Sequence, residues 1–363
     1  MSKGSAIKTN GLHEPFYDPT KSYQENFTQG PFGAFAKADK TVDAQKSKEF
    51  MGQSVASTFG IPAGPLLNAR FVTAAFRMGF DLCVYKTVRS QEYPCHPHPN
   101  VLAVKHSGDL TLKQAQGKLV ANDTYEQPLS ITNSFGVPSM NPDFWQADMR
   151  SAVESAGTGQ ICIGSFQGTK RPGMSSAEFI ADHVTTARLV KETGTQIMEV
   201  NLSCPNEGTS DLLCFDIDRV QQIAHAIKSE IGDTPFILKL AYFEDENQLK
   251  KMITTLGNIV QGFSVINTIP ATIVDEQGNQ ALPGEGRARS GVCGTTIKWA
   301  GLDMVSRVNK IRTQNNADFS IIGVGGVMNQ SDYESYITAG ADAVMSATGA
   351  MWNPYLAQEI KNT

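Results

Sequence analysis

Short apolar segments alternate with longer segments of helical periodicity along most of this chain. The short segments predict buried strands near residues 54–60, 81–88, 160–166, 196–203, 235–241, 262–269, 319–325 and 342–347. The longer segments predict helices near residues 67–79, 141–156, 175–193, 216–230, 246–257, 295–313, 330–339 and 353–361. Eight successive strand–helix units of such even spacing are typical of an α/β fold, the (β/α)8 TIM barrel. An open doubly wound sheet is the alternative, although it rarely uses eight such units.

Three segments lie outside this repeat. Residues 1–50 are polar and interrupted by glycine and proline, so we interpret them as an N-terminal extension that wraps the body or is partly mobile. Residues 51–363 then form one barrel domain. Residues 89–140 contain strand-like pieces but no helical pattern, and residues 270–293 are rich in glycine and also poor in helix signals. In a barrel both are long loops at the carboxyl-terminal mouth, where active sites are built.

The composition is that of an ordinary globular protein and excludes several classes of function. The chain has 363 residues, of which 40% are hydrophobic and 18% charged, with a formal net charge of -5. This balance gives no basic surface for nucleic acid. The six cysteines form no CxxC pair, which argues against a zinc ribbon or an iron–sulfur cluster and fits a reducing compartment. Without an apolar leader or a run long enough to span a bilayer, we expect a cytoplasmic protein that does not enter a membrane.

Polar residues stand at the carboxyl ends of several predicted strands, where barrel enzymes carry their chemistry. Taken singly, such residues are usually solvated charges or turns. Together they offer lysines, carboxamides and hydroxyls without an acidic pair, which favours a flat heterocycle with carbonyl groups over a sugar. They are Lys86-Thr87, Asn201 to Asn206, Lys239 and Asn267-Thr268, joined by Asn133 in the first long loop.

The last two strand ends carry a different signal. Gly325-Gly326 follows the seventh strand and Ala347-Thr348 follows the eighth. Backbone N–H groups in these two loops of a barrel bind phosphate without a basic side chain. The alternative is that the two glycines only allow a strand and a helix to pack closely. A phosphorylated ligand or cofactor is therefore the favoured interpretation.

One thiol lies among polar side chains at the end of the fourth strand, in Asn201-Leu202-Ser203-Cys204-Pro205-Asn206. This placement makes Cys204 a candidate catalytic residue, and an inert buried thiol is the other interpretation. Two further groups are weaker. The proline-rich segment 94–99 holds Cys95, His96 and His98 but no further ligand nearby, so no metal is expected. The basic residues Arg287, Arg289 and Lys298 are interpreted as a solvated face rather than an anion contact.

These residues resemble the dihydroorotate dehydrogenase family, in particular its soluble class 1 branch with a cysteine base. The hexapeptide 201–206 matches the catalytic motif of that branch, and Lys86-Thr87 is similar to its Lys-Ser pair. The resemblance covers residues 54–360. Further similar segments are 132–138, 238–240, 265–268, 290–294 and 321–326 with Ala347-Thr348.

The resemblance implies an FMN enzyme that oxidises (S)-dihydroorotate to orotate in pyrimidine biosynthesis, with Cys204 as the base and flavin N5 as the hydride acceptor. Without cluster-type cysteines the electrons must pass to a soluble acceptor such as fumarate, a quinone, oxygen or a partner subunit, and the sequence does not decide among these. The resemblance implies a homodimer. The implied substrate-binding residues are Lys86, Asn133, Phe135, Gly136, Val137, Asn201, Asn206, Asn267 and Thr268. The implied cofactor-binding residues are Ala63, Gly64, Lys86, Thr87, Asn133, Asn201, Lys239, Gly291, Gly325, Gly326, Ala347 and Thr348.

The chain departs from the family pattern in two places. Residues 207–210 read Glu-Gly-Thr-Ser in place of the familiar continuation, and Phe135 replaces the usual methionine. These changes concern the substrate more than the cofactor. They leave open an FMN enzyme for another dihydropyrimidine of the dihydrouracil type, a phosphate-binding barrel with no redox role, and a catalytically silent flavin-binding subunit.

Overall fold

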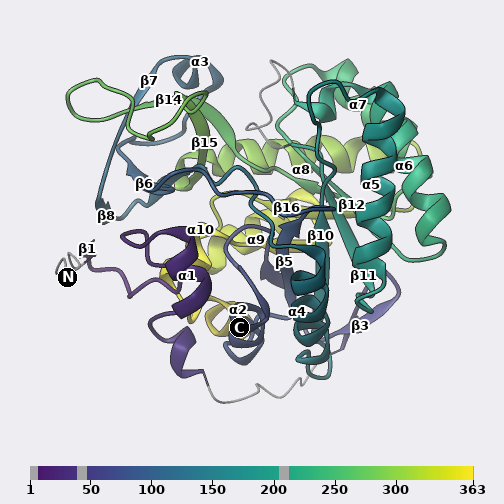
Figure 1. Ribbon diagram of the computed structural model, residues 1–363, viewed down its shortest axis with the longest axis horizontal. Helices are drawn as coiled ribbons and strands as arrows, with labels where there is room; N and C mark the ends of the chain where they lie inside the picture. The colour runs from purple at the N-terminus through teal and green to yellow at the C-terminus, as the bar shows by residue number, and fades with distance from the viewer. Residues whose placement is uncertain (1–6, 39–46, 204–211, 363) are drawn as a thin grey trace.

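The computed structural model describes residues 7–38, 47–203 and 212–362. Its centre is a closed barrel of eight parallel strands, in which the last strand pairs with the first (Figure 1). The predicted (β/α)8 TIM barrel is therefore confirmed. In order around the barrel the strands are β4 (Phe59–Ile61), β5 (Leu82–Val88), β10 (Ile161–Phe166), β11 (Ile197–Asn201), β12 (Phe236–Leu240), β13 (Gly262–Val265), β16 (Ser320–Val324) and β17 (Ala343–Met345).

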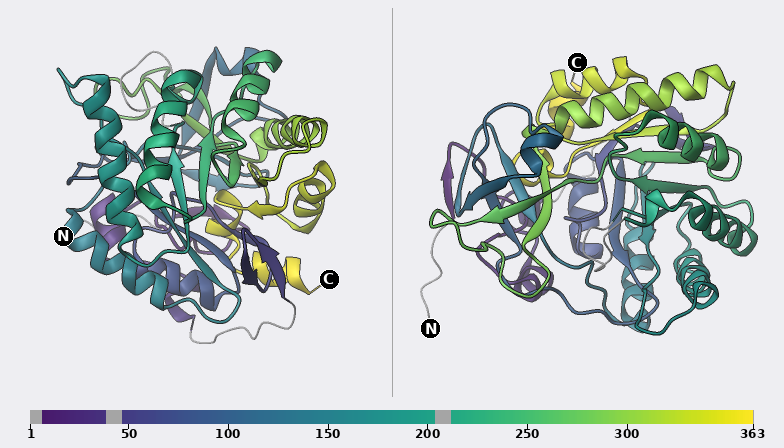
Figure 2. Two further views of the ribbon diagram at one scale, coloured as in Figure 1. Left: turned by 90° about the vertical axis from the view of Figure 1, so that its right-hand side faces the viewer. Right: turned by 90° about the horizontal axis from the view of Figure 1, so that it is seen from above.

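A helix lies after each barrel strand and covers its outer face (Figures 1 and 2). Local signals fix several helix ends. At the start of α5, for example, the Ser175 hydroxyl accepts from Glu178 N, and the Glu178 carboxylate accepts from Ser175 N, which is a capping box. The helices are α2 (Ala69–Arg77), α4 (Pro142–Glu154), α5 (Ser176–Lys191), α6 (Ile217–Ile231), α7 (Glu246–Leu256), α8 (Lys298–Gln314), α9 (Gln330–Ala339) and α11 (Leu356–Lys361), with the short α10 (Thr348–Trp352) before α11.

The first predicted strand, residues 54–60, was wrong in its bounds. It spans two elements: β3 (Gln53–Val55), which pairs antiparallel with β2 (Lys48–Phe50), and the barrel strand β4. Phe50 and Val55 pack against the apolar side chains inside the barrel, so this hairpin covers one end of it. Alternation of apolar and polar residues indicates a strand but not its pairing partner, which explains the error. The sixth strand likewise ends at Val265, earlier than predicted.

The interior of the barrel has an apolar layer and a polar layer. Side chains two residues apart on a strand point to the same side, so each strand contributes to both layers. The apolar layer includes Val84, Ile163, Ile197, Ile237 and Ile322. The polar layer lies two residues further along four of these strands and consists of the buried residues Lys86, Ser165, Glu199 and Lys239. Ser264 on the neighbouring β13 is also buried and belongs to this layer. The polar layer therefore faces the carboxyl-terminal mouth.

Gly60 on β4 allows the closest backbone approach in the barrel wall. A Cβ atom there would lie 1.8 Å from the carbonyl oxygen of Leu82 on β5. We expect Gly60→Ala to lower the free energy of unfolding by about 3 kcal/mol, because the two strands must separate. Urea unfolding followed by circular dichroism measures this loss. Gly117→Ala, at an exposed position where the new Cβ meets only Gln114 O at 3.2 Å, is the control and should change stability by less than about 0.5 kcal/mol. Equal midpoints for the two variants would contradict the prediction.

The two long loops together form a second sheet beyond the carboxyl ends of the barrel strands (Figure 2). This sheet is also closed, in the order β14–β15–β9–β6–β7. The loop 89–140 contains a short helix, α3 (Leu112–Ala115), which the sequence did not predict because a four-residue helix shows no periodicity. The strands are β6 (Val101–Val104), β7 (Lys118–Asn122), β9 (Ser130–Asn133), β14 (Ile269–Val274) and β15 (Arg289–Gly294).

The described part of the N-terminal segment packs against the barrel. It contains β1 (Lys8–Asn10), which pairs with β8 (Thr124–Glu126), the helix α1 (Tyr23–Gln29) and the 3-10 turn η1 (Phe35–Lys37). Phe16 and Phe35 stack with ring centroids 4.4 Å apart and belong to the main hydrophobic core. Backbone N–H of Phe16 donates to Met351 O at 3.2 Å, which ties this segment to α10.

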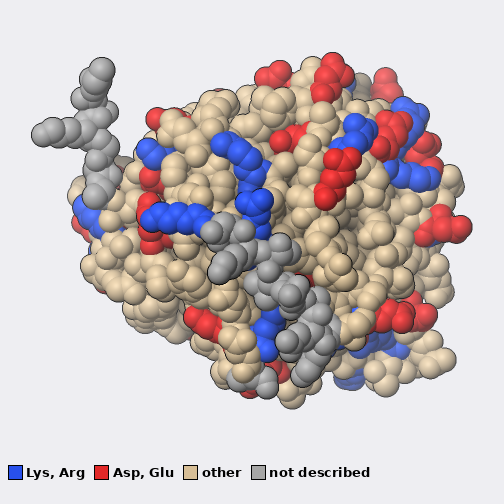
Figure 3. Space-filling model, turned by 90° about the horizontal axis from the view of Figure 1, so that it is seen from below, with Lys and Arg blue, Asp and Glu red and all other residues tan. Residues whose placement is uncertain are grey.

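One face of the molecule carries charges of both signs. On the face shown in Figure 3, acidic and basic side chains are interspersed and large areas carry neither.

Within residues 7–38, 47–203 and 212–362, no helix combines the length and apolarity that a membrane crossing needs.

Candidate functional site

A cavity lies where the second sheet covers the mouth of the barrel. It brings together residues from seven of the eight barrel strand ends and from β6, β9 and β15 of the second sheet. Most residues that the sequence predicted for the site line this one cavity. They are Ala63, Gly64, Lys86, Thr87, Asn133, Phe135, Gly136, Val137, Asn201, Lys239, Asn267, Thr268, Gly291, Ala347 and Thr348.

Four predicted residues are not placed in the cavity. Cys204 and Asn206 lie outside the described residues. Gly325 and Gly326 follow β16 and are not among the residues that line the cavity. Gly325 O accepts from the Tyr336 hydroxyl at 2.7 Å, and a Cβ on Gly326, whose φ is +65°, would meet Lys298 Cβ at 2.8 Å. Close packing between strand and helix therefore needs glycine at 326, and at 325 glycine allows the φ of +131°, whether or not a phosphate binds there.

Carboxamides at the ends of β11 and β13 form a hydrogen-bonded network. Asn201 Nδ2 donates to Gln167 Oε1 at 2.8 Å, and its Oδ1 accepts from Ser203 N at 3.3 Å. Asn267 Nδ2 donates to Ser203 Oγ at 3.0 Å. These bonds fix the residue directly before Cys204, so the strand end is held beside the two asparagines.

The second sheet holds Asn133 over the barrel. Gly291 on β15 stands opposite Asn133 on β9, and the Ser290 hydroxyl donates to Asn133 O at 2.7 Å. Asn133 Nδ2 lies 3.4 Å from Cys293 Sγ. A Cβ on Gly291 would lie 2.3 Å from Thr268 Oγ1, so only glycine allows this sheet to approach the loop after β13 so closely.

The charge in the cavity is positive. Lys86 and Lys239 are 6% and 5% exposed, and the described residues that line the cavity include no Asp or Glu. Burial lowers the pKa of Lys239, although the neighbouring Glu199 carboxylate raises it in part. A cavity with two buried cations and several amide donors suits an anionic ligand rich in acceptor atoms.

Glu199 lies in the polar layer beneath the cavity and was missed in the sequence. It is 1% exposed on β11, on the strand next to Lys239, and its Oε1 accepts from Ser165 Oγ at 3.3 Å. Burial raises its pKa, while Lys239 and the hydroxyls of Ser165 and Ser264 act in the opposite direction. The sequence did contain a signal for Glu199, because a carboxylate inside an otherwise apolar strand needs a partner.

Other lining residues gave no sequence signal. Tyr17 comes from the N-terminal segment, Val101 and Ile131 from the second sheet, and Met351 from α10. These residues are apolar or aromatic and lie in segments whose position follows only from the tertiary fold. No local pattern distinguishes them from core residues.

The interpretation of Arg287 as a solvated residue was wrong. Its side chain is buried, and its guanidinium donates to the carbonyl oxygens of Pro97 at 2.8 Å, Pro99 at 3.2 Å and Ser134 at 3.0 Å. It therefore fastens the proline-rich loop to the second sheet. Arg289 is exposed as predicted, and Lys298 pairs with Asp332 at 2.6 Å.

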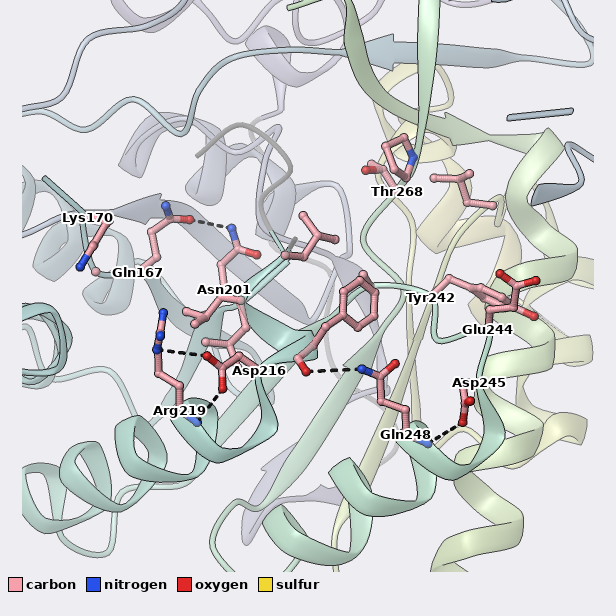
Figure 4. Close-up of a pocket in the computed structure, with 18 of the residues that line it drawn as sticks. Gln167, Lys170, Asn201, Asp216, Arg219, Tyr242, Glu244, Asp245, Gln248 and Thr268 are labelled. Carbon is pink, nitrogen blue, oxygen red and sulfur yellow. Dashed lines mark hydrogen bonds and ion pairs between the residues drawn. The ribbon is translucent and has the colours of Figure 1, made fainter. Parts of the chain in front are cut away.

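A second and larger cavity, of about 890 Å³, adjoins the first (Figure 4). The two share Asn201 and Thr268. Its walls carry both signs of charge, partly paired with each other, as in the 3.2 Å contact of Arg219 with Asp216. Figure 4 shows Gln167 turned toward Asn201, to which it is hydrogen-bonded on the side of the larger cavity.

A closed eight-stranded barrel whose polar strand ends converge on a cavity at its mouth defines a (β/α)8-barrel enzyme. The family model described as dihydroorotate dehydrogenase matches residues 46–363, and this chain belongs to that family of oxidoreductases. The family and the enzyme class predicted from the sequence are thus confirmed.

Individual relatives span most of the chain. A dihydroorotate dehydrogenase of Dictyostelium discoideum is 35% identical over 97% of this chain and 98% of its own. The catalytic subunit of dihydroorotate dehydrogenase B (NAD(+)) of Desulforamulus reducens is 27% identical over 74% of this chain and 83% of its own. A crystal structure of the Eimeria tenella enzyme in complex with ferulenol superposes with a TM-score of 0.67, covering 90% of this chain and 87% of that one, at 18% identity, and so shares the fold.

Proposed function

We propose that this protein oxidises (S)-dihydroorotate to orotate with FMN, in de novo pyrimidine biosynthesis, as a class 1 member of its family. The observation that carries this proposal is the convergence of two buried lysines and three asparagines on one cavity at the barrel mouth. The amide donors and acceptors match the mixed edge of a pyrimidinedione ring, and the lysines match anionic groups.

The residues of the cavity fit FMN. Gly64 has a φ of +138°, and nothing lies within 4 Å of the position its Cβ would occupy, so its backbone is open to a flat ring. When bound, FMN supplies the hydride acceptor that no amino-acid side chain provides. The residues that would hold it are Ala63, Gly64, Lys86, Thr87, Asn133, Asn201, Lys239, Gly291, Ala347 and Thr348, with Gly325 and Gly326 in the loop after β16.

In this proposal Cys204 removes the proton from C5 of the substrate. Only the thiolate can do so, and a free thiol has a pKa of about 8.5. Asn201 and Asn267, which are held by Ser203, bind and orient the pyrimidine ring. Lys86 adds a positive charge for the substrate carboxylate, and Lys239 supplies positive charge on the cofactor side.

The electron acceptor is proposed to be a small soluble molecule such as fumarate. The sequence contains no cysteine pair of the spacing that iron–sulfur clusters use, so electrons must leave through an external acceptor. We propose that the enzyme works in the cytoplasm as a homodimer. Steady-state turnover with fumarate, a quinone and oxygen compared at equal concentration, and light scattering of the purified protein, test these points.

Anaerobic mixing tests the activity itself. We expect dihydroorotate to bleach the visible absorbance of the FMN-loaded protein within seconds, while dihydrouracil at the same concentration leaves it unchanged, because only dihydroorotate offers a carboxylate to Lys86. Bleaching by dihydrouracil alone would assign another dihydropyrimidine as the substrate. A protein that stays colourless after FMN is added would exclude a flavin enzyme.

A further inference from the structure

Tyr17 is the point at which the N-terminal segment reaches the cavity. Both neighbours are fixed by hydrogen bonds: Phe16 N donates to Met351 O at 3.2 Å, and Asp18 N donates to Asn26 Oδ1 at 2.7 Å. The Tyr17 ring meets Phe135 edge to face, with centroids 5.6 Å apart and planes at 89°. The backbone and the ring therefore leave this side chain little freedom.

The hydroxyl of Tyr17 is buried without a partner. The residue is 2% exposed, and its oxygen has no hydrogen-bond partner among the described residues. Burial, with Cys95 and Tyr23 nearby, raises its pKa well above the usual range, so it stays protonated and is a hydrogen-bond donor. The same residue lines the cavity that holds Lys86, Asn133 and Thr268.

A buried hydroxyl without a partner costs free energy, and phenylalanine would fill the same space without that cost. The aromatic ring alone therefore does not explain a tyrosine at this position. Buried polar groups in native proteins almost always have a partner, and here the only open volume that Tyr17 borders among the described cavities is the proposed binding site.

We propose that Tyr17 donates a hydrogen bond to an acceptor atom of a molecule bound in this cavity, so that the N-terminal segment is part of the binding site. The inference rests on the proposed function, which supplies two possible acceptors: a carbonyl or ring nitrogen of the flavin, and a carbonyl or carboxylate oxygen of the pyrimidine. The flavin atoms and the pyrimidine atoms would each accept a hydrogen bond from a neutral phenol. Separate titrations with FMN and with orotate distinguish the two ligands.

The test uses the full chain with Tyr17→Phe, which removes only the hydroxyl. Apoprotein is titrated with FMN by flavin fluorescence, and FMN-loaded protein is titrated with orotate by its visible difference spectrum. We expect one of the two dissociation constants to rise about 10-fold, the size expected for one lost hydrogen bond. The melting temperature of the apoprotein should stay the same or rise, because an unpaired buried group is lost.

Tyr23→Phe is the matched control. Tyr23 also contacts Phe135, with centroids 6.0 Å apart, but it does not line the cavity, so both dissociation constants should stay within twofold of the wild type. If Tyr17→Phe also leaves both constants within twofold, the proposal is overturned, and a drop in apoprotein stability would then indicate that the hydroxyl binds water. Wild-type protein that binds neither FMN nor orotate would contradict the proposed function and, with it, the ligand of Tyr17.

Discussion

Cys204→Ala is expected to slow the reduction of bound FMN by dihydroorotate about 10²- to 10⁴-fold near neutral pH, the usual contribution of a general base. The residue has no role in the proposed cofactor contacts, so the variant should purify with its flavin and a normal visible spectrum. Stopped-flow mixing without oxygen measures the rate directly. A fully active alanine variant would refute the assignment of the base.

The dependence of this rate on pH provides a second check. In the wild type the rate should rise with pH as the thiolate forms, around the ordinary thiol pKa of about 8.5 unless the site shifts it. Cys204→Ser should show activity only at higher pH, because a hydroxyl ionises far less readily. Cys162→Ala is the control, because this buried thiol on β10 does not line the cavity. Its rate should stay within a few-fold of the wild type at every pH.

Lys239→Met is expected to lower the free energy of unfolding of the apoprotein by a few kcal/mol at neutral pH, because the buried Glu199 carboxylate loses the nearby positive charge that lowers its pKa. Methionine keeps the length of the side chain but leaves the Glu199 carboxylate buried without its cation. Urea unfolding between pH 5 and pH 8 measures the loss.

The sign of the pH dependence follows from Glu199. Its pKa in the folded variant lies above the unfolded value of about 4.3, so the folded state keeps a proton that the unfolded state releases. The stability of Lys239→Met should therefore fall as the pH rises from 5 to 8. The double variant Lys239→Met with Glu199→Gln removes the carboxylate and should recover most of the stability and lose this slope. A single variant as stable as the wild type at every pH would show that the two groups are not coupled.

Most of the barrel could be predicted because the alternation of apolar strands and amphipathic helices is a local property of the sequence. The strand-end members of the cavity, such as Lys86, Asn201 and Lys239, followed from one further rule, that parallel strands bring their carboxyl ends together. The loop members Phe135, Gly136, Val137 and Gly291 were predicted only from the family resemblance. The pairing of β3 with β2 did not follow, because the pattern of a strand does not name its partner.

The roles of Arg287 and Tyr17 could not be predicted from the sequence, and the physical reason is the same for both. Arg287 satisfies its guanidinium with the carbonyl oxygens of a loop nearly two hundred residues away, and no pattern near residue 287 reports that loop. Tyr17 is held at the cavity by tertiary contacts, such as its ring contact with Phe135 and the hydrogen bond of the neighbouring Phe16 backbone. Glu199 is different, since an acid inside a buried strand was visible in the sequence and required a cation such as Lys239.

The bond between Phe16 N and Met351 O joins segments from the two ends of the chain beside the same cavity. The barrel closes in the same way, since β17 pairs with β4. During synthesis on the ribosome, the cavity therefore stays incomplete until β17 and α10 have emerged. We expect cofactor uptake to follow translation, and a nascent chain arrested before residue 343 to retain no flavin when it is isolated on the ribosome.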